Sequence, residues 1–192
     1  MALWRDDTAP VELRSRLITM RAPMADDYDI WAKLRSASRN NTAPWEPEWS
    51  SDELTRSAYR KRMRSYERAW RDGSGYPFFV FRKKDGVLLG ACNLNNVRRG
   101  VLQATDIGYW IGTPYLRKGF AREAVRLIIR FGFGELGLHR IEAACRPEND
   151  ASKTLLTGLG FQPEGYARQY LKIAGEWRDH EKFALLSSDP WP

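Results

Sequence analysis

Residues 107–123 constrain the fold most, because they combine a strand, a turn and a helix within one short stretch of chain. The strand reads Ile-Gly-Tyr-Trp-Ile, and Gly112, Thr113 and Pro114 then turn the chain. The helix that follows is amphipathic, with one apolar face made of Ala121, Ala124, Val125, Ile128 and Ile129. This pattern predicts a strand that stops, a tight turn and an amphipathic helix.

The turn itself is small and basic, and it reads Leu116-Arg117-Lys118-Gly119-Phe120-Ala121. A helix N-terminus offers free N–H groups and a positive dipole potential, which together suit a phosphate or pyrophosphate. Glycine lets the backbone approach such a ligand closely. The turn matches neither the P-loop pattern nor G-x-G-x-x-G. Taken alone, it fits an ordinary strand–helix connection with solvated cations equally well.

A second motif further along the chain favours the ligand-binding interpretation. It reads Arg146-Pro-Glu-Asn149-Asp-Ala-Ser152 and is followed by Leu159-Gly-Phe161. In this order, the two motifs resemble the acetyl-CoA motifs of the GNAT N-acetyltransferases, which are a turn R/Q-x-x-G-x-G/A and an Asn before a short helix closed by Leu-Gly-Phe. The resemblance is greatest to the RimJ/RimL branch, the ribosomal-protein N-terminal acetyltransferases, and extends over residues 13–186.

The resemblance implies acetyl-CoA as cosubstrate, with its pyrophosphate on the backbone N–H groups of residues 117–121. The main chain of Ile111 and the amide of Asn149 would bond the pantetheine arm, although Asn149 is also a good helix N-cap. Leu116 departs from the family, which has Gln or Arg there. The implied cofactor-binding residues are Ile111, Leu116, Arg117, Lys118, Gly119, Phe120, Ala121, Asn149 and Ser152.

The implied reaction is direct attack of an amine on the thioester, which needs a neutral amine and a proton for the leaving thiolate. The family's Tyr acid is replaced here by Leu156, so Ser152 is the candidate acid, with ordinary helix polarity as its alternative. A Glu found in some relatives is replaced by Ala144. Glu142 and Asp106 are therefore the candidate bases, although each is also a plausible structural hydrogen-bond partner.

The weakness of these bases favours an acceptor that loses its proton easily. An α-amine has a pKa near 7.7–8.0, so roughly a tenth is neutral at pH 7, whereas well under about one lysine in a thousand is neutral. We therefore expect the N-terminal α-amine of a protein, by resemblance a ribosomal protein. The alternatives are a small-molecule amine (polyamine, amino acid or antibiotic) and a non-catalytic module that docks RNA or the ribosome.

Charge and cysteine usage limit the partners and the compartment. The net charge of +7 favours acidic partners or serves solubility alone, and no RNA-binding motif is visible. Cys92 and Cys145 form no disulfide-rich pattern, which favours a reducing cytoplasm. His139 and His180 have no partners at ligand spacing, so we expect no metal. One basic segment is a candidate ribosome contact, with Arg56, Arg60, Lys61, Arg62, Arg64 and Arg68.

The sequence also bears on membranes and on assembly. No apolar run reaches the roughly 18 residues that cross a bilayer, and no signal peptide is visible at the N-terminus. We expect a cytoplasmic monomer or homodimer with no membrane or DNA partner. Trp45 and Trp49, in a loop at 40–49, could line an acceptor pocket or cover the edge of the core.

Periodicity predicts an α+β fold, with a single mixed, mostly antiparallel sheet flanked by helices, in one domain over residues 1–192. A capping box of Ser50 and Glu53 would open the second helix, and Gly73 would end it. Helices are predicted at 25–38, 50–71, 119–135 and 149–158. Strands are predicted at 13–21, 76–82, 87–97, 101–111 and 138–145, with a last hairpin of 166–173 and 177–186.

Overall fold

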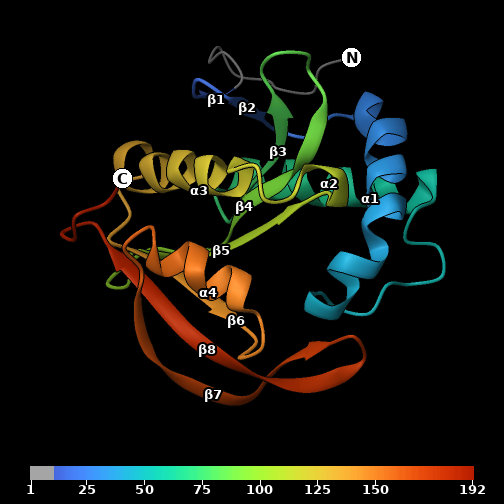
Figure 1. Ribbon diagram of the computed structural model, residues 1–192. Helices are drawn as coiled ribbons and strands as arrows, with labels where there is room; N and C mark the ends of the chain where they lie inside the picture. The colour runs from blue at the N-terminus through green and yellow to red at the C-terminus, as the bar shows by residue number, and fades with distance from the viewer. Residues whose placement is uncertain (1–10) are drawn as a thin grey trace.

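The computed structural model describes residues 11–192 and contains one eight-stranded sheet (Figure 1). The strand order is β1-β2-β3-β4-β5-β6-β8-β7. Every neighbouring pair is antiparallel except β5 and β6, which are parallel. The predicted α+β fold with a mixed, mostly antiparallel sheet is confirmed. The strands are β1 (Glu12–Arg14), β2 (Ile18–Arg21), β3 (Tyr76–Arg82), β4 (Leu88–Arg98), β5 (Ala104–Ile111), β6 (Arg140–Cys145), β7 (Gln162–Ile173) and β8 (Glu176–Leu186).

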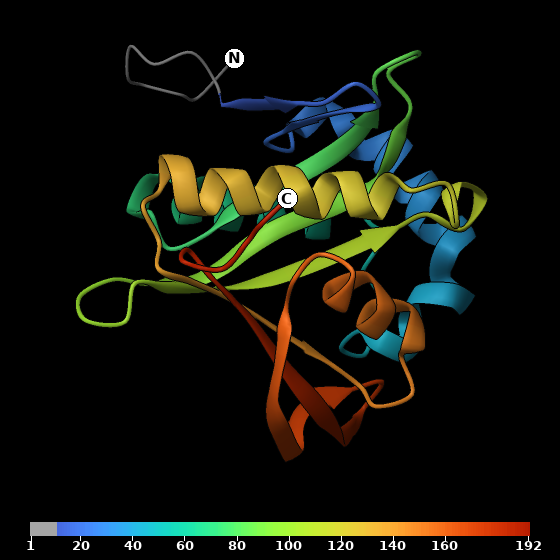
Figure 2. The same cartoon turned by 60° about the vertical axis from the view of Figure 1, so that its left-hand side comes forward.

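Helices cover both faces of this sheet, as Figures 1 and 2 show. On one face, α1 (Tyr28–Thr42) and α2 (Arg56–Asp72) pack through an aromatic cluster that contains Trp31 and Tyr59. On the other face, α3 (Phe120–Arg130) and α4 (Asp150–Thr157) pack on the larger core. The apolar face predicted for α3 points into that core, since Ala124, Val125, Ile128 and Ile129 are at most 1% exposed.

The N-terminal prediction of one strand over residues 13–21 is wrong, because the segment is a hairpin. Residues 15–17 separate β1 from β2, and Arg14 pairs with Thr19 across the turn. The Ser15 hydroxyl accepts hydrogen bonds from the N–H groups of Leu17 and Ile18 at 3.1 and 3.2 Å. This local side-chain-to-backbone bonding is what serine offers in turns.

The capping box predicted at Ser50 is also wrong, because α2 begins at Arg56. Its N-cap is Thr55, whose hydroxyl accepts from the Ala58 N–H at 3.2 Å. Glu53 instead forms an ion pair with Arg62 on the first turns of the helix. At the other end the prediction is confirmed, since Gly73 adopts the left-handed conformation (φ +64°) that ends many helices.

Several predicted boundaries shift by a few residues. The first helix runs to Thr42 and leads into a 3-10 turn over Ala43–Trp45. The helix after the basic turn is α-helical to Arg130 and continues as a π-helical turn over Phe131–Glu135. The last hairpin begins earlier than predicted, at Gln162. Within residues 11–192, no helix combines the length and apolarity that a membrane crossing requires.

Candidate active site

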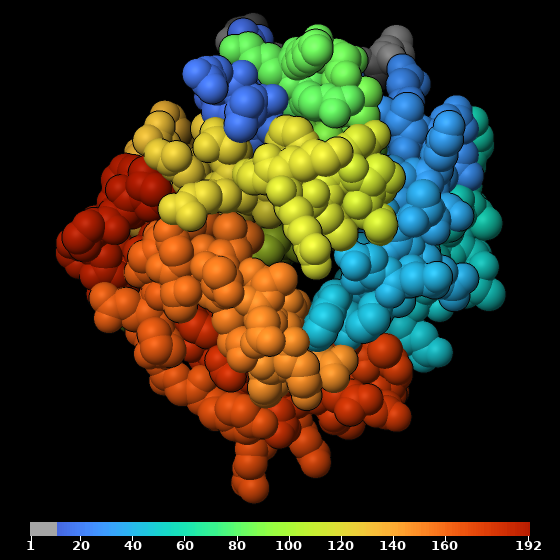
Figure 3. Space-filling view, viewed as in Figure 1, coloured from blue at the N-terminus to red at the C-terminus, as the bar shows by residue number. Residues whose placement is uncertain are grey.

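The candidate site lies where β5 and β6 separate. Their parallel pairing covers three positions and ends at Asp106 opposite Glu142, after which the strands diverge (Figure 2). The edge of β5 that faces β6 is therefore unpaired in the sheet from Ile107 to Ile111. A pocket opens at the divergence, and Figure 3 shows the surface hollowed there between α4 and the end of α1. The pocket is lined by Trp45, Ile107, Gly108, Tyr109, Ala143, Ala144, Cys145, Arg146, Asn149, Ser152, Leu156 and His180.

The basic turn lies beyond the end of β5 and leads into α3. Arg117 and Gly119 both adopt left-handed conformations, with φ of +58° and +79°. Within the described residues, the N–H groups of residues 117–121 have no hydrogen-bond partner. A run of free donors at a helix N-terminus is the arrangement that binds phosphate groups in proteins. The turn therefore fits a pyrophosphate.

Glycine is favoured at position 119 by its backbone conformation. A Cβ added at Gly119 would meet no atom within 4 Å, so space does not select glycine there. The φ of +79° selects glycine, because residues with a Cβ rarely adopt this backbone conformation. Leu116, where the family has Gln or Arg, packs partly buried against the larger core, and its N–H donates to the Thr113 carbonyl at 3.4 Å.

Asn149 serves as the N-cap of α4. Its Oδ1 accepts from the Ser152 N–H at 3.1 Å, so the alternative role considered for this residue is present. The Asn149 Nδ2 group has no partner within residues 11–192, although the residue lines the pocket. One side chain thus caps the helix with its oxygen and leaves its amide N–H groups free for a ligand.

Ser152 lies beside a residue that the sequence analysis did not select. The Tyr109 hydroxyl donates to Ser152 Oγ at 3.3 Å, and both residues line the pocket. Burial raises the pKa of Tyr109 far above its ordinary value, so the phenol keeps its proton and remains a donor. Because Ser152 accepts this bond, its own proton is free to point elsewhere. The sequence contained one signal that could have identified Tyr109. Side chains alternate along a strand, so Tyr109 lies on the same face of β5 as Ile107.

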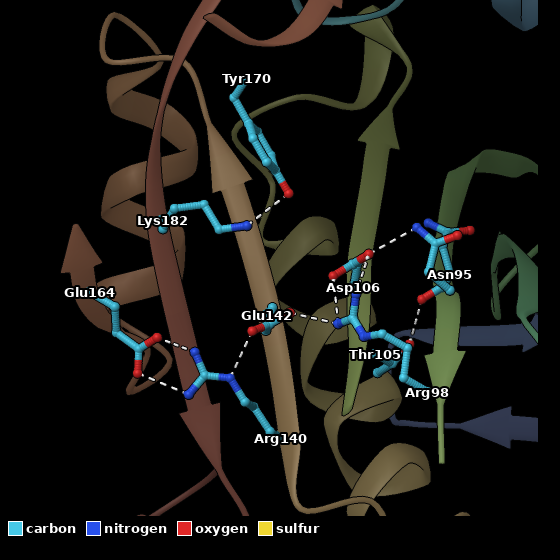
Figure 4. A network of polar contacts seen from close by, with 10 residues as sticks. Asn95, Arg98, Thr105, Asp106, Arg140, Glu142, Glu164, Tyr170 and Lys182 are labelled. Atoms are coloured by element: carbon cyan, nitrogen blue, oxygen red, sulfur yellow. Dashed lines mark hydrogen bonds and ion pairs between the residues drawn. The ribbon is translucent and has the colours of Figure 1, made fainter. Parts of the chain in front are cut away.

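Asp106 and Glu142 lie at the closed end of the divergence, within an ion-pair network (Figure 4). Arg98 contacts both, at 3.0 Å to Asp106 Oδ1 and 2.6 Å to Glu142 Oε2. Arg140 donates to Glu142 Oε1 at 2.8 Å and also pairs with Glu164. Neither candidate base is among the residues that line the pocket. Their role as bases stays a prediction.

The chain matches the model of the acetyltransferase (GNAT) domain over residues 17–162. The chain belongs to the GNAT acetyltransferase family. It is 34% identical to the [ribosomal protein uS5]-alanine N-acetyltransferase of Escherichia coli K12 over 191 residues, which cover 98% of this chain and 97% of that protein. Both confirm the predicted enzyme class, an N-acetyltransferase.

Two solved structures of GNAT acetyltransferases resemble the chain closely. The ribosomal-protein-S5-alanine acetyltransferase of Vibrio fischeri superimposes with a TM-score of 0.86 at 30% identity and covers 95% of this chain and 100% of its own. RimJ of Mycobacterium smegmatis, solved in complex with CoA-disulfide, has a TM-score of 0.84 at 30% identity and covers 92% and 86%. The predicted likeness to the RimJ/RimL branch is confirmed.

In this GNAT domain, Trp45 comes from the turn after α1 and lines the pocket together with Arg146 and His180. The Arg146 guanidinium lies 5.4 Å from the Trp45 ring and donates to the Pro44 carbonyl at 2.9 Å, so it fixes the loop after α1 to the site. Trp45 therefore lines the pocket, as one of the two predicted readings had it. His180 is only 3% exposed.

Trp49 lies outside the pocket wall, in a cluster around a buried arginine. Its ring lies 4.3 Å from the Arg35 guanidinium, and its Nε1 donates to Glu46 Oε2 at 3.0 Å. Arg35 is 5% exposed and forms two hydrogen bonds with the Glu46 carboxylate, at 2.8 and 2.6 Å. This cluster holds Glu46 in place, and Glu46 directly follows Trp45, which lines the pocket.

Cys145 also lines the pocket of this GNAT domain but is unsuited to act as a nucleophile. Burial and, to a lesser extent, the charge of Glu181 raise its pKa to about 11. The thiolate, rather than the thiol, is the nucleophilic form of cysteine, and it is scarce at neutral pH when the pKa is this high. No group of three or more metal-ligating side chains occurs among the described residues.

Proposed function

We propose that this enzyme transfers the acetyl group of acetyl-CoA to the N-terminal α-amine of a protein, by direct attack of the amine on the thioester. The observation that carries the proposal is the pocket between the diverging strands, which is lined by Asn149 and Ser152, together with the free N–H groups of residues 117–121 at the start of α3. Two of the relatives, from Escherichia coli and Vibrio fischeri, act on the alanine of ribosomal protein uS5 or S5, so a ribosomal protein is the expected acceptor.

The residues present fit acetyl-CoA at three points. The free N–H groups of residues 117–121 would hold its pyrophosphate, with Arg117 and Lys118 adding positive charge. The unpaired edge of β5, up to Ile111, and the amide of Asn149 would hold the pantetheine arm. The bound cosubstrate supplies an activated acyl group, and a CoA compound is present in the structure of the Mycobacterium smegmatis relative.

Ser152 would stabilise the sulfur that leaves. Tyr109 donates to its oxygen, which directs the serine proton away from the phenol. The hydroxyl can then hydrogen-bond to a developing thiolate, and such bonds to charged groups are stronger than neutral ones. Direct transfer, without an acetylated enzyme, agrees with the protonated state of the Cys145 thiol.

The acceptor would enter from the face that carries α1. The loop over residues 43–49 and the turn of the last hairpin meet there, since the Ala174 N–H donates to the Glu46 carbonyl at 2.9 Å. No carboxylate lines the pocket, so the described site offers no strong base for a lysine ammonium. An α-amine loses its proton more easily by roughly 2.5 pKa units and fits such a site.

The test uses one peptide sequence in two forms. The first has a free N-terminal Ala or Ser and no lysine, and the second has a blocked N-terminus and one internal lysine. We expect acetylation of the first form only, detected by mass spectrometry, with a pH–rate profile that reports an amine near 8. Equal or faster acetylation of the blocked form would overturn the proposal, and activity on small amines alone would replace it with the small-molecule alternative.

A further inference from the structure

The proposed reaction needs a group that accepts the proton of the attacking amine, and the pocket contains one whose role is unassigned. We infer that His180 is this group and takes the amine proton on Nε2; the inference rests on the proposed function. His180 lines the same pocket as Ser152 but comes from β8, on the opposite side of the site from α4. No other imidazole or carboxylate lines the pocket within the described residues.

The ring is held so that one nitrogen is open. Nδ1 lies 3.0 Å from the Arg178 carbonyl, which can only accept, so Nδ1 carries the proton in the neutral ring. Nε2, the basic nitrogen, has no hydrogen-bond partner within residues 11–192. Among the described residues, only two side-chain nitrogen or oxygen atoms are shielded from solvent and lack a hydrogen-bond partner. They are Nε of Arg98 and Nε of Arg178, so Nε2 of His180 is not one of them. Nε2 is therefore in contact with open space, and the open space at His180 is the pocket.

The position of His180 also matches the side from which the amine would arrive. Lys182 pairs with Ala144 on β6, and alternation places His180 and Lys182 on one face of the sheet. That face carries α1 and α2, whereas Tyr109 packs on the core under α3 and α4. The site thus has Ser152 on the side of the leaving sulfur and His180 on the side of the entering amine.

The surroundings of His180 keep its ring neutral. Burial lowers the pKa of His180 below its ordinary value, and the positive charges of Arg146 and Lys182 lower it further. The Arg178 carbonyl and the Asp179 carboxylate act in the opposite direction but do not reverse the shift. Tyr170 contributes a ring contact, with centroids 5.7 Å apart. A neutral imidazole at pH 7 is the form that accepts a proton.

The proton balance of the step is complete without a further reactant. The neutral α-amine forms a C–N bond to the acyl carbon, and the C–S bond to the thiol breaks. The nitrogen becomes acidic as its bond forms, so a weak base suffices, and Nε2 takes the proton and releases it to solvent. The sulfur leaves as a thiolate that the Ser152 hydroxyl stabilises, and it takes a proton from solvent.

The experiment compares His180→Gln with His139→Gln. His139 is the only other histidine of the chain; it is exposed, lies just before β6 and is outside the pocket. With the amine that the wild type acetylates, we expect kcat to fall about 100-fold or more for His180→Gln, because general bases contribute about 100- to 10,000-fold. We expect the acetyl-CoA affinity to stay unchanged, and His139→Gln to behave as wild type. The acidic limb of the kcat/KM profile that protonation of the amine causes should remain in every variant, and the further decrease at lower pH that protonation of His180 causes should disappear only in His180→Gln.

Two further measurements keep the inference testable if His180→Gln folds poorly. In the wild type, ¹⁵N spectra of the two histidine rings should show one ring that is neutral at pH 7 with its proton on Nδ1, and this signal should be absent from any folded His180 variant. Added imidazole should restore part of the kcat of His180→Ala. A charged His180 ring at pH 7, or a wild-type kcat in His180→Gln, would overturn the inference.

Failure of the inference and failure of the proposed function give different results. If the wild type acetylates only small amines, the proposed function fails and the same variants are compared with that amine. If the wild type acetylates peptide N-termini and His180→Gln keeps its kcat, the inference alone fails. Asp106 and Glu142 would then be the remaining candidates for the base.

Discussion

At the scale of single residues, the site depends on what each polar atom already bonds. The oxygen of Asn149 caps α4 and that of Ser152 accepts from Tyr109, so the free groups are an amide N–H pair and a hydroxyl proton. The carboxylates of Asp106 and Glu142, by contrast, are occupied by guanidinium groups. The hydrogen-bonding groups that have no partner in the protein, rather than the residue types, decide what the site can offer a ligand.

Ser152→Ala should lower kcat and kcat/KM together by about 10- to 100-fold. A hydrogen bond to a charged group contributes about 1.5–3 kcal/mol, and each 1.36 kcal/mol corresponds to about a factor of ten in rate. The N-cap bond uses the Ser152 main chain, so the helix should remain intact. Steady-state kinetics and acetyl-CoA titration would measure both effects.

Tyr109→Phe is the matched variant for Ser152→Ala. It removes only the bond that orients the serine, so we expect a smaller loss of kcat than in Ser152→Ala. A larger loss in Tyr109→Phe would mean that the phenol itself donates to the leaving sulfur. An unchanged kcat in Ser152→Ala would assign Ser152 a structural role only.

At the scale of elements, two helix N-termini face the separation of β5 and β6. The start of α3 presents free N–H groups from a left-handed turn, and the start of α4 is capped by a side chain that also borders the pocket. Each helix start is formed by a few consecutive residues, so a single substitution can change it without altering the strands.

Gly119→Asp and Gly119→Asn separate charge from backbone strain at the start of α3. The two side chains are close in size, both tolerate positive φ better than most residues, and no atom lies within 4 Å of the added Cβ. Acetyl-CoA should raise the melting temperature of the wild type by mass action. The rise should persist in Gly119→Asn and be lost in Gly119→Asp, because a carboxylate repels the pyrophosphate. An equal rise in both variants would place the pyrophosphate elsewhere.

Substitutions at Asn149 separate the cap from the proposed contact with the cosubstrate. Asn149→Ala should lower the free energy of unfolding by about 1 kcal/mol, because it removes the N-cap bond to Ser152. Asn149→Asp keeps an acceptor and should retain that stability, but it lacks the amide donors and should bind acetyl-CoA more weakly. Urea unfolding and calorimetric titration give the two readouts. Wild-type affinity in Asn149→Asp would show that the amide N–H groups contact nothing.

At the scale of the whole molecule, the net charge of +7 is concentrated in part on one helix. Of the basic residues on α2, Arg56, Arg62 and Arg71 are paired with Asp29, Glu53 and Asp72. The other four, Arg60, Lys61, Arg64 and Arg68, are exposed and have no ion pair within the described residues. Arginines four positions apart lie along one side of a helix, so they form a stripe that fits a phosphate backbone.

Replacing Arg60, Arg64 and Arg68 by Gln should weaken binding to ribosomal particles. The slope of log affinity against log salt should become shallower by roughly 0.7–0.9 per lost phosphate contact. The kcat/KM for a short peptide should not change, since the stripe lies outside the pocket. The control replaces the exposed Arg16, Lys33 and Lys84 by Gln, which changes the net charge equally. An equal loss in the control would assign the effect to net charge alone.

The sequence by itself determined the features that are made locally. The basic turn, the cap by Asn149 and the apolar face of α3 each depend on residues a few positions apart, and periodicity revealed the mixed sheet. The turn at Ser15 was missed because short hydroxyl-to-backbone bonds compete with longer patterns. The start of α2 was missed because Thr55 caps the helix, whereas the Ser50 hydroxyl donates to the Asp52 carboxylate.

Only the tertiary structure decided which side chains share the pocket. Tyr109 meets Ser152 across 43 positions, and His180 comes from β8, which is placed beside β6 by strand pairing. Asp106 and Glu142 had the right chemistry in the sequence, but Arg98 engages both at the closed end of the strands. These contacts depend on the register of the sheet and on the divergence of β5 from β6. Both result from pairing between strands that are far apart in the sequence, so the spacing of a local motif cannot predict them.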